Sequence, residues 1–157
     1  AEIYINSKEL SKEINKKTCV IYGGTPLTEL VSARWKTQIN ENAKSKAYIG
    51  SMPEVHHNEI LSWDANPKSS KNDYVLIFLR DSEEHPQIKK RFELTEKLLE
   101  DKVDIYNIET KTSDSLLKKL MELVLFGDLF SISLSDELGM IPEDIEAIEN
   151  LKEMLGD

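Results

Sequence analysis

The sequence predicts an α/β fold in which helices cover both faces of a parallel, doubly wound sheet. Runs of β-branched and aromatic residues alternate with helix-like segments of about 10 to 20 residues, the order that parallel sheets require. The run Tyr74–Leu79 is almost entirely apolar, which is typical of a central strand buried on both faces. No repeat or low-complexity tract interrupts the 157 residues, so we expect one domain, residues 1–157.

Local signals predict the first strand and the first helix. Residues 18–22 (TCVIY) have strand propensity and end at a pair of glycines, which indicates a tight turn. Pro26 suits the first turn of a helix, and Thr25 before it can cap that helix by accepting a backbone hydrogen bond. The helical pattern then continues to about Asn42.

The later elements continue the alternation of strands and helices. Asp64–Asp73 is polar and is expected to be a connector. Crossovers between parallel strands should be right-handed, and ligands should bind at the carboxyl ends of the strands. We expect strands over residues 47–51, 74–79 and 102–108, and helices over residues 53–63, 86–100, 115–138 and 142–155.

The composition argues against several classes of function. Its 20 basic and 29 acidic residues give a net charge of −9, which disfavours binding to nucleic acid or to an anionic membrane. No apolar run is long enough to span a membrane, and the first residues are too charged for a signal peptide. Cys19 is the only cysteine and lies in a predicted strand, so we expect a buried thiol, no disulfide and a cytoplasmic location.

Gly23 and Gly24 stand where the first strand turns into the first helix. Backbone amides at such a turn can hold an anion or a sugar hydroxyl, which makes both glycines candidates for substrate binding. The alternative is that they only make the turn. The sequence lacks the glycine-rich patterns of dinucleotide and nucleoside triphosphate sites, so we expect no such cofactor.

The first helix carries two candidate site residues. Arg34 and Glu41 are seven residues apart and therefore share a helical face with apolar Leu30 and Val31. A carboxylate near the carboxyl ends of the strands, partly shielded from water by Trp35, would have the raised basicity of a general base. The alternative for Glu41 is a solvated or capping residue at a helix end.

His56 and His57 are adjacent, so their side chains point in different directions and do not easily serve one site. One of them can be exposed while the other faces a cleft. A zinc site would need histidines one turn apart or a clear third ligand, and the sequence contains neither pattern. We therefore predict no metal site.

Two segments together resemble a known family. RWKTQINENAK (34–44), followed by PEVHHNEI (53–60) and Trp63, resembles the C-terminal half of the archaeal and bacterial bifunctional phosphoglucose/phosphomannose isomerases. Those proteins contain tandem sugar isomerase (SIS) domains. The resemblance is strong over residues 20–63 and weak in the last helix. It implies a SIS-type, flavodoxin-like sheet with a C-terminal helical extension.

The resemblance also implies roles for individual residues. Glu41 matches the glutamate that moves a proton between sugar carbons 1 and 2, through a cis-enediol and without metal or cofactor. His57 matches the histidine that opens the sugar ring, in the site of the neighbouring subunit. Lys152 matches a C-terminal lysine near the ring oxygen, and it or Arg34 would stabilise charge on the sugar oxygens. His56 has no counterpart and is expected to be structural or exposed.

The same resemblance implies that part of the site lies outside this chain. The family's first SIS domain carries an active-site arginine and a Ser/Thr-rich loop that holds the substrate phosphate, and no such loop occurs here. The chain begins at Ala1 rather than Met, so we expect it to be the C-terminal half of a two-domain isomerase. Its expected partners are the N-terminal SIS domain, a sugar-phosphate substrate and a second copy in a homodimer. The expected reaction interconverts glucose 6-phosphate and fructose 6-phosphate, with mannose 6-phosphate as a second substrate.

Two other interpretations remain open. The domain could bind sugar phosphates without catalysis, as regulatory SIS domains do, although such a domain would not need both Glu41 and His57. Alternatively, it is a dimerisation module whose polar residues are incidental. In that case Glu41 and His57 should point to opposite regions of the surface, with no cleft beside either.

Overall fold

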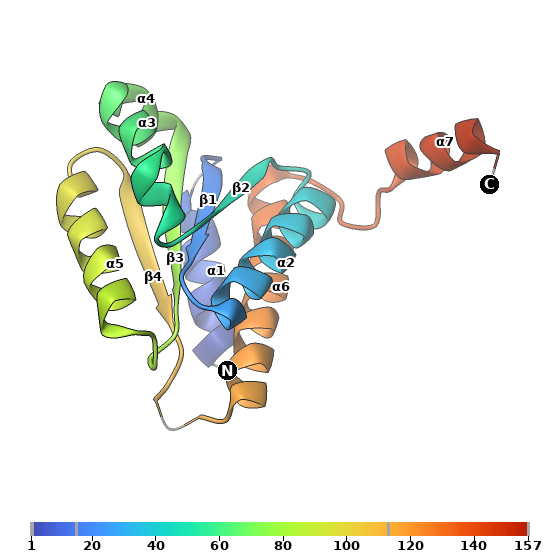
Figure 1. The fold of residues 1–157 in the computed structure, drawn as a ribbon. Helices are drawn as coiled ribbons and strands as arrows, with labels where there is room; N and C mark the ends of the chain where they lie inside the picture. Colours follow the sequence, from blue (N-terminus) through green and yellow to red (C-terminus); the bar gives the residue numbers. More distant parts are fainter. Residues whose placement is uncertain (1, 15, 113, 157) are drawn as a thin grey trace.

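The computed structural model of the chain describes residues 2–14, 16–112 and 114–156. Its centre is a sheet of four parallel strands in the order β2-β1-β3-β4 (Figure 1), which confirms the predicted parallel α/β sheet. We call the end of the sheet where the strands begin the amino end, and the end where they finish the carboxyl end. The strands are β1 (Thr18–Gly23), β2 (Ala47–Ser51), β3 (Tyr74–Arg80) and β4 (Asp104–Glu109).

Helices cover both faces of the sheet and give the domain two separate cores. Side chains of β1 and β3 alternate between these cores: Ile21 and Ile77 enter the first, and Tyr22 and Phe78 enter the second. The first face carries α1 (Glu2–Ile14), α2 (Pro26–Asn42) and α6 (Leu116–Leu138). The second face carries η1 (Glu54–His57), which is a short 3-10 helix, α3 (Glu59–Ala65), α4 (Pro67–Asp73) and α5 (Pro86–Leu99).

The two central strands are buried as predicted. Residues 75–79 of β3 have no exposed surface, which confirms this run as a strand covered on both faces. Cys19 in β1 is also fully buried. Burial raises the pKa of its thiol to about 12, so the reactive thiolate does not form near neutral pH.

The second face has more helix than the sequence pattern predicts. Residues 64–73, expected as a connector, contain α4, because Pro67 occupies its first position and the Asn66 side chain accepts a hydrogen bond from the Ser69 backbone. The helix predicted over residues 53–63 is divided at Asn58, whose non-helical backbone separates η1 from α3.

The start and direction of α2 follow from its flanking strands. Thr25 caps the helix as predicted, in a capping box with Thr28. Because β1 and β2 are parallel, the helix between them must run back from the carboxyl end of the sheet to its amino end. The last turn of α2 therefore lies at the amino end.

The C-terminal helix α7 (Glu146–Leu155) stands apart from the rest of the domain as an arm (Figure 1). This confirms a C-terminal helical extension, although α7 is shorter than the predicted helix because a turn occupies residues 141–144. None of the described residues of α7 is buried. Among the described residues, no helix is long and apolar enough to cross a membrane.

Candidate active site

Glu41 lies in the last turn of α2, at the amino end of the sheet. This position contradicts our expectation that it lies near the carboxyl ends of the strands. The reason is topological: a helix that follows β1 starts at the carboxyl end, and 17 residues carry it back across the whole sheet. The catalytic role that we predict for Glu41 depends on that position, so its geometric support fails, and only the resemblance of residues 34–44 still favours Glu41 as the base.

A hollow of about 380 Å³ nevertheless lies beside Glu41. The end of α2 forms one wall, and residues 144–148, which include the first turn of α7, form the other. Lys44 joins the two walls, because its Nζ donates to the carbonyl oxygens of Glu41 (2.6 Å) and Pro142 (3.1 Å). The cleft that a pure dimerisation module would lack is therefore present beside Glu41.

The surroundings of Glu41 differ from those that we predicted. Its side chain is exposed, whereas Trp35 is fully buried in the first core. The Trp35 ring stacks on Phe126 and Phe130, and its Nε1 donates to the Leu123 carbonyl oxygen at 2.8 Å. The prediction that Trp35 shields Glu41 from water is wrong, because Trp35 faces α6 instead.

Lys152 is exposed on α7 and does not line the hollow beside Glu41. The wall formed by the arm ends at Ile148, and Lys152 lies one helical turn further out. We expected Lys152 to approach the same cleft. The structure brings the start of α7 to Glu41 but leaves Lys152 outside.

His57 is exposed at the end of η1, which follows the carboxyl end of β2. Glu41 and His57 therefore lie at opposite ends of the sheet, and one chain does not bring them together. A dimerisation module would show the same separation, so only the hollow beside Glu41 counts against that interpretation. His56 is the structural member of the pair. Its ring contacts α5 through Thr95 Oγ1 (2.7 Å) and Arg91 Nη1 (3.0 Å).

Gly23 and Gly24 have structural roles. The backbone N–H groups of Gly24 and Thr25 both donate to Thr28 Oγ1 at 3.0 Å, so these amides are already engaged within the chain. A Cβ at Gly23 would lie 2.7 Å from the backbone nitrogen of Glu29, and one at Gly24 would lie 2.6 Å from an Ile88 methyl carbon. Close packing of the turn accounts for both glycines, and their expected contact with an anion has no support here.

Arg34 also has a partner inside the chain. Its Nη2 donates to Asp128 Oδ2 of α6 at 2.9 Å, and Gln38 donates to the other oxygen of the same carboxylate at 3.0 Å. Arg34 does not line the hollow beside Glu41. The contact joins α2 to α6, and the role in substrate binding that we expected for Arg34 is not supported.

The carboxyl end of the sheet contains a charge cluster that the sequence analysis missed. Lys119 is only 2% exposed and donates to Asp81 Oδ1 at 2.8 Å and to the Glu83 carboxylate. Burial raises the pKa of Asp81, but the hydrogen bond and charge of Lys119, together with hydrogen bonds from the Glu83 backbone and Thr110, outweigh burial and lower that pKa. The sequence signal that could have indicated this cluster is the charged run RDSEE (80–84) at the end of a buried strand.

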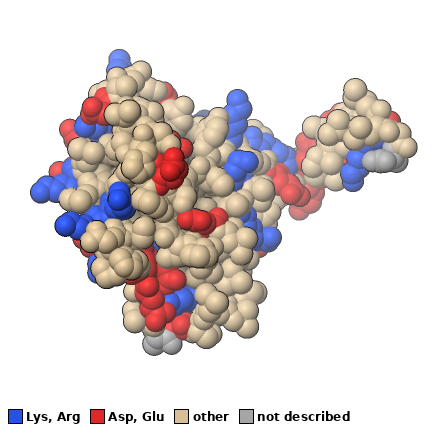
Figure 2. Space-filling model, viewed as in Figure 1, with Lys and Arg blue, Asp and Glu red and all other residues tan. Residues whose placement is uncertain are grey.

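Arg80 and Glu84 complete this cluster. Arg80 Nε donates to Glu84 Oε1 at 2.8 Å, and the guanidinium lies 4.7 Å from the centre of the Phe92 ring. Figure 2 shows acidic side chains gathered at the lower end of the domain, where the strands finish. The chain's own ion pairs therefore occupy the end of the sheet where α/β folds usually bind ligands.

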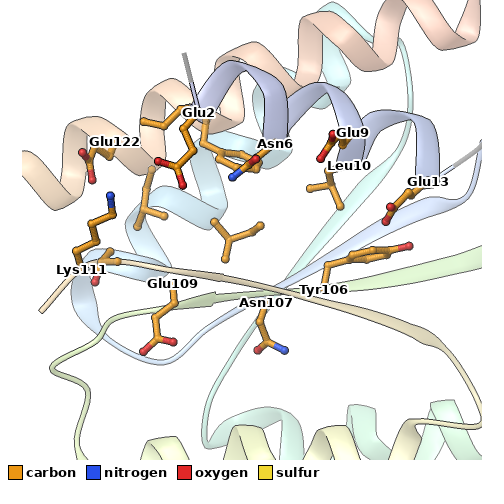
Figure 3. Close-up of a pocket in the computed structure, with 15 residues that line it drawn as sticks. Glu2, Asn6, Glu9, Leu10, Glu13, Tyr106, Asn107, Glu109, Lys111 and Glu122 are labelled. Atoms are coloured by element: carbon orange, nitrogen blue, oxygen red, sulfur yellow. The ribbon is translucent and has the colours of Figure 1, made fainter.

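A second hollow, of about 430 Å³, lies between α1, β4 and α6 (Figure 3). It contains none of the residues that the sequence analysis selected. The charged residues of its lining are five glutamates and one lysine, Lys111, and this excess of negative charge would repel a phosphate. The acidic residues are Glu2, Glu9, Glu13, Glu109 and Glu122.

Comparison with known proteins identifies similar sequences and folds. The family model described as the bacterial phospho-glucose isomerase C-terminal SIS domain matches residues 5–155. A bifunctional phosphoglucose/phosphomannose isomerase of Aquifex aeolicus is 37% identical over 94% of this chain and 45% of its own length. An enzyme of the same name from Caldicellulosiruptor bescii is 32% identical over 96% of this chain and 44% of its own length.

The fold is similarly shared. The crystal structure of a glucose-6-phosphate isomerase-like protein from Thermus thermophilus has a TM-score of 0.69 and 16% identity, covering 87% of this chain and 44% of that one. At this identity the similarity shows the fold alone. The chain spans less than half the length of the curated relatives described above.

Proposed function

Because the chain belongs to the family of bacterial phosphoglucose isomerase C-terminal SIS domains, we propose that it is one half of a sugar-phosphate aldose–ketose isomerase. The whole enzyme interconverts glucose 6-phosphate and fructose 6-phosphate and accepts mannose 6-phosphate as a second substrate. The observation that carries this proposal is the family match over residues 5–155. The relatives that share 37% and 32% of its residues bear the corresponding name.

Glu41 is the proposed base. In the open-chain aldose its carboxylate removes the proton from carbon 2, and the electron pair forms the carbon 1–carbon 2 double bond of an enediol as the carbonyl oxygen gains a proton. The same carboxyl group then returns the proton to carbon 1, while the hydroxyl on carbon 2 loses its proton and becomes the new carbonyl. A single carboxylate can carry both transfers, and a hollow lies beside Glu41.

The rest of the site must come from outside this chain. Glu41 is exposed, so the described part of this chain does not exclude water from its carboxylate. The net charge of −9 and the internal ion pairs at the carboxyl end of the sheet also make this half a poor phosphate binder. We propose that the N-terminal SIS domain covers Glu41 and holds the phosphate.

His57 acts in the site of a second copy, in a homodimer. It is exposed and lies at the other end of the sheet from Glu41, so the two groups can meet only across a subunit boundary. His57 opens the sugar ring by proton transfer to the ring oxygen. Lys152 stabilises charge on that oxygen once the arm is covered by the rest of the enzyme.

The direct test is to assay this chain alone and mixed with a separately produced N-terminal half. We expect no isomerisation by either half and isomerisation by the mixture, measured as fructose 6-phosphate formed from glucose 6-phosphate. The matched control is the same mixture with Glu41→Gln. A mixture that binds the sugar phosphate but never converts it would favour the non-catalytic regulatory domain instead.

A further inference from the structure

His57 belongs to a short 3-10 helix whose geometry has to be set by tertiary contacts. η1 contains four residues, and its N-cap Pro53 makes no side-chain capping bond. Such a turn has little stability of its own, because 3-10 hydrogen bonds have poor geometry. A local clamp supplies one restraint: Asn58 donates to Glu54 Oε1 at 3.0 Å and accepts from the Glu59 backbone at 2.6 Å.

Tyr22 of β1 packs beside Val55, which precedes His57 in the sequence, and bonds to Glu59, which follows it. On the side before it, Val55 is buried, and a Cβ at Gly50 would lie 2.6 Å from both the Val55 side chain and the Tyr22 ring. The two side chains therefore pack closely over Gly50. On the side after it, the Tyr22 hydroxyl is 2.6 Å from Glu59 Oε2.

The direction of the hydrogen bonds at Tyr22 is fixed. Trp63 Nε1 lies 2.9 Å from the Tyr22 oxygen and can only donate, so the hydroxyl proton of Tyr22 is directed to Glu59. Burial, together with the Glu59 carboxylate, raises the pKa of Tyr22, so the hydroxyl keeps its proton. A chain of two hydrogen bonds thus connects Trp63, Tyr22 and Glu59.

The neighbouring residue His56 is held by two residues of α5, Arg91 and Thr95. Arg91 has no acceptor, so the Nδ1 of His56 that it contacts must accept, and Nε2 must carry the proton. That proton is donated to Thr95 Oγ1, whose own hydrogen goes to the Arg91 carbonyl oxygen at 2.8 Å. The ring of His56 is thereby fixed against α5, while His57 remains exposed.

We infer that Tyr22 and Glu59 are positioning residues for His57: they hold η1 so that its exposed imidazole reaches one place in the site of the neighbouring subunit. This inference rests on the proposed function of His57. A phenylalanine at position 22 would pack equally well over Gly50 and beside Val55. The hydroxyl of Tyr22 therefore acts through its two hydrogen bonds, one from Trp63 and one to Glu59, and only the second reaches the segment next to His57.

The test uses variants of the whole two-domain enzyme. Turnover of the ring-closed sugar phosphate requires His57, whereas exchange of the carbon 2 proton in a substrate supplied in open-chain form does not. Tyr22→Phe and Glu59→Ala should each lower kcat for the ring-closed substrate on the order of 10-fold, with KM changed less than about 2-fold. Exchange from the open-chain substrate should stay normal. Glu59→Gln should retain activity, because its amide oxygen can still accept from Tyr22.

Two controls make the outcomes distinct. Val103→Ala removes methyl groups from the same core without touching η1, so it reports the effect of lost stability alone. Normal ring-closed turnover by His57→Ala would overturn both this inference and the proposed role of His57. A slow His57→Ala together with normal Tyr22→Phe and Glu59→Ala would overturn the positioning role only. Equal loss of activity in Val103→Ala, or in Glu59→Gln, would also overturn it.

Discussion

At the carboxyl end of the sheet, Lys119 and Arg80 are buried among carboxylates of their own chain, whereas at the amino end Glu41 lies exposed beside a hollow. The usual rule for α/β folds places ligands at the carboxyl end. In this domain internal ion pairs occupy part of that end, and Glu41 with its hollow lies at the opposite one. If Glu41 is the base, as we propose, the position of the site depends on which charges the chain leaves unneutralised as well as on sheet topology.

The largest effect should come from Glu41→Gln in the two-domain enzyme. The amide keeps the size of the side chain but cannot take a proton, so exchange at carbon 2 should fall by a factor on the order of 10² to 10⁴. Deuterium incorporation from solvent measures this step. Substrate binding should change little, because we propose that the N-terminal SIS domain holds the phosphate.

Glu29→Gln is the matched control, because Glu29 lies on the same helix at the carboxyl end and bonds to Ser51. Its exchange rate should stay near normal. If Glu29→Gln loses as much exchange as Glu41→Gln, the functional contrast between the two ends of the sheet disappears.

The next largest effect concerns Lys119 and the carboxyl end. Lys119→Met leaves the Asp81 carboxylate without its buried partner and should lower the free energy of unfolding by about 2 kcal/mol. The loss is below that of a fully buried pair, because Glu83 is largely exposed. Urea unfolding of this chain measures it. An unchanged midpoint would show that the ion pairs do not stabilise this end.

The smallest effect is a pH dependence of stability that arises from His56. Burial, followed by the charges of Arg91 and His57, lowers the pKa of His56 from its ordinary 6.5 in the folded chain. The unfolded chain therefore binds this proton more readily. Neutral His56 therefore contributes to the free energy of unfolding. This contribution is fully present when the pH is above the ordinary pKa of 6.5, and it is lost as the pH falls through the lower pKa of the folded chain.

Unfolding in urea at about pH 7.5 and about pH 5.5 tests this dependence. Between these two pH values, the free energy of unfolding should fall less in His56→Gln than in the native chain. In His57→Gln it should fall almost as much as in the native chain. Identical pH profiles of the native chain and His56→Gln would refute the assignment of His56 as the residue held neutral against α5.

Much of the fold could be predicted because its signals are local. The buried run of β3, the cap at Thr25 and the alternation of strands and helices are all visible in short windows. α1 was missed because it is largely polar and buries only one narrow face, at Leu10 and Ile14, against the first core. Its burial depends on α6, which lies more than 100 residues away in sequence.

The site was harder to predict because its residues depend on tertiary contacts. Nothing in the pair His56 and His57 shows which ring faces α5, since Arg91 and Thr95 come from a later helix. The sequence also did not show that Arg34 has a partner, because Asp128 lies on α6, far away in the sequence. The error over Glu41 was of another kind: the direction of α2 follows from the parallel pairing of β1 and β2, and the topology could have placed Glu41 correctly.

The length of α6 has a consequence for the whole arm. Its 23 residues span about 35 Å, so a helix that starts after β4 at the carboxyl end finishes at the amino end, where Glu41 also lies. Gly139, in a left-handed conformation (φ 67°), ends the helix there and lets the chain turn outward. Deleting one turn of α6 would withdraw the base of the arm by about 5 Å and separate it from the end of α2. The length of α6 therefore sets the distance between Glu41 and α7, although no residue of α6 lines the hollow.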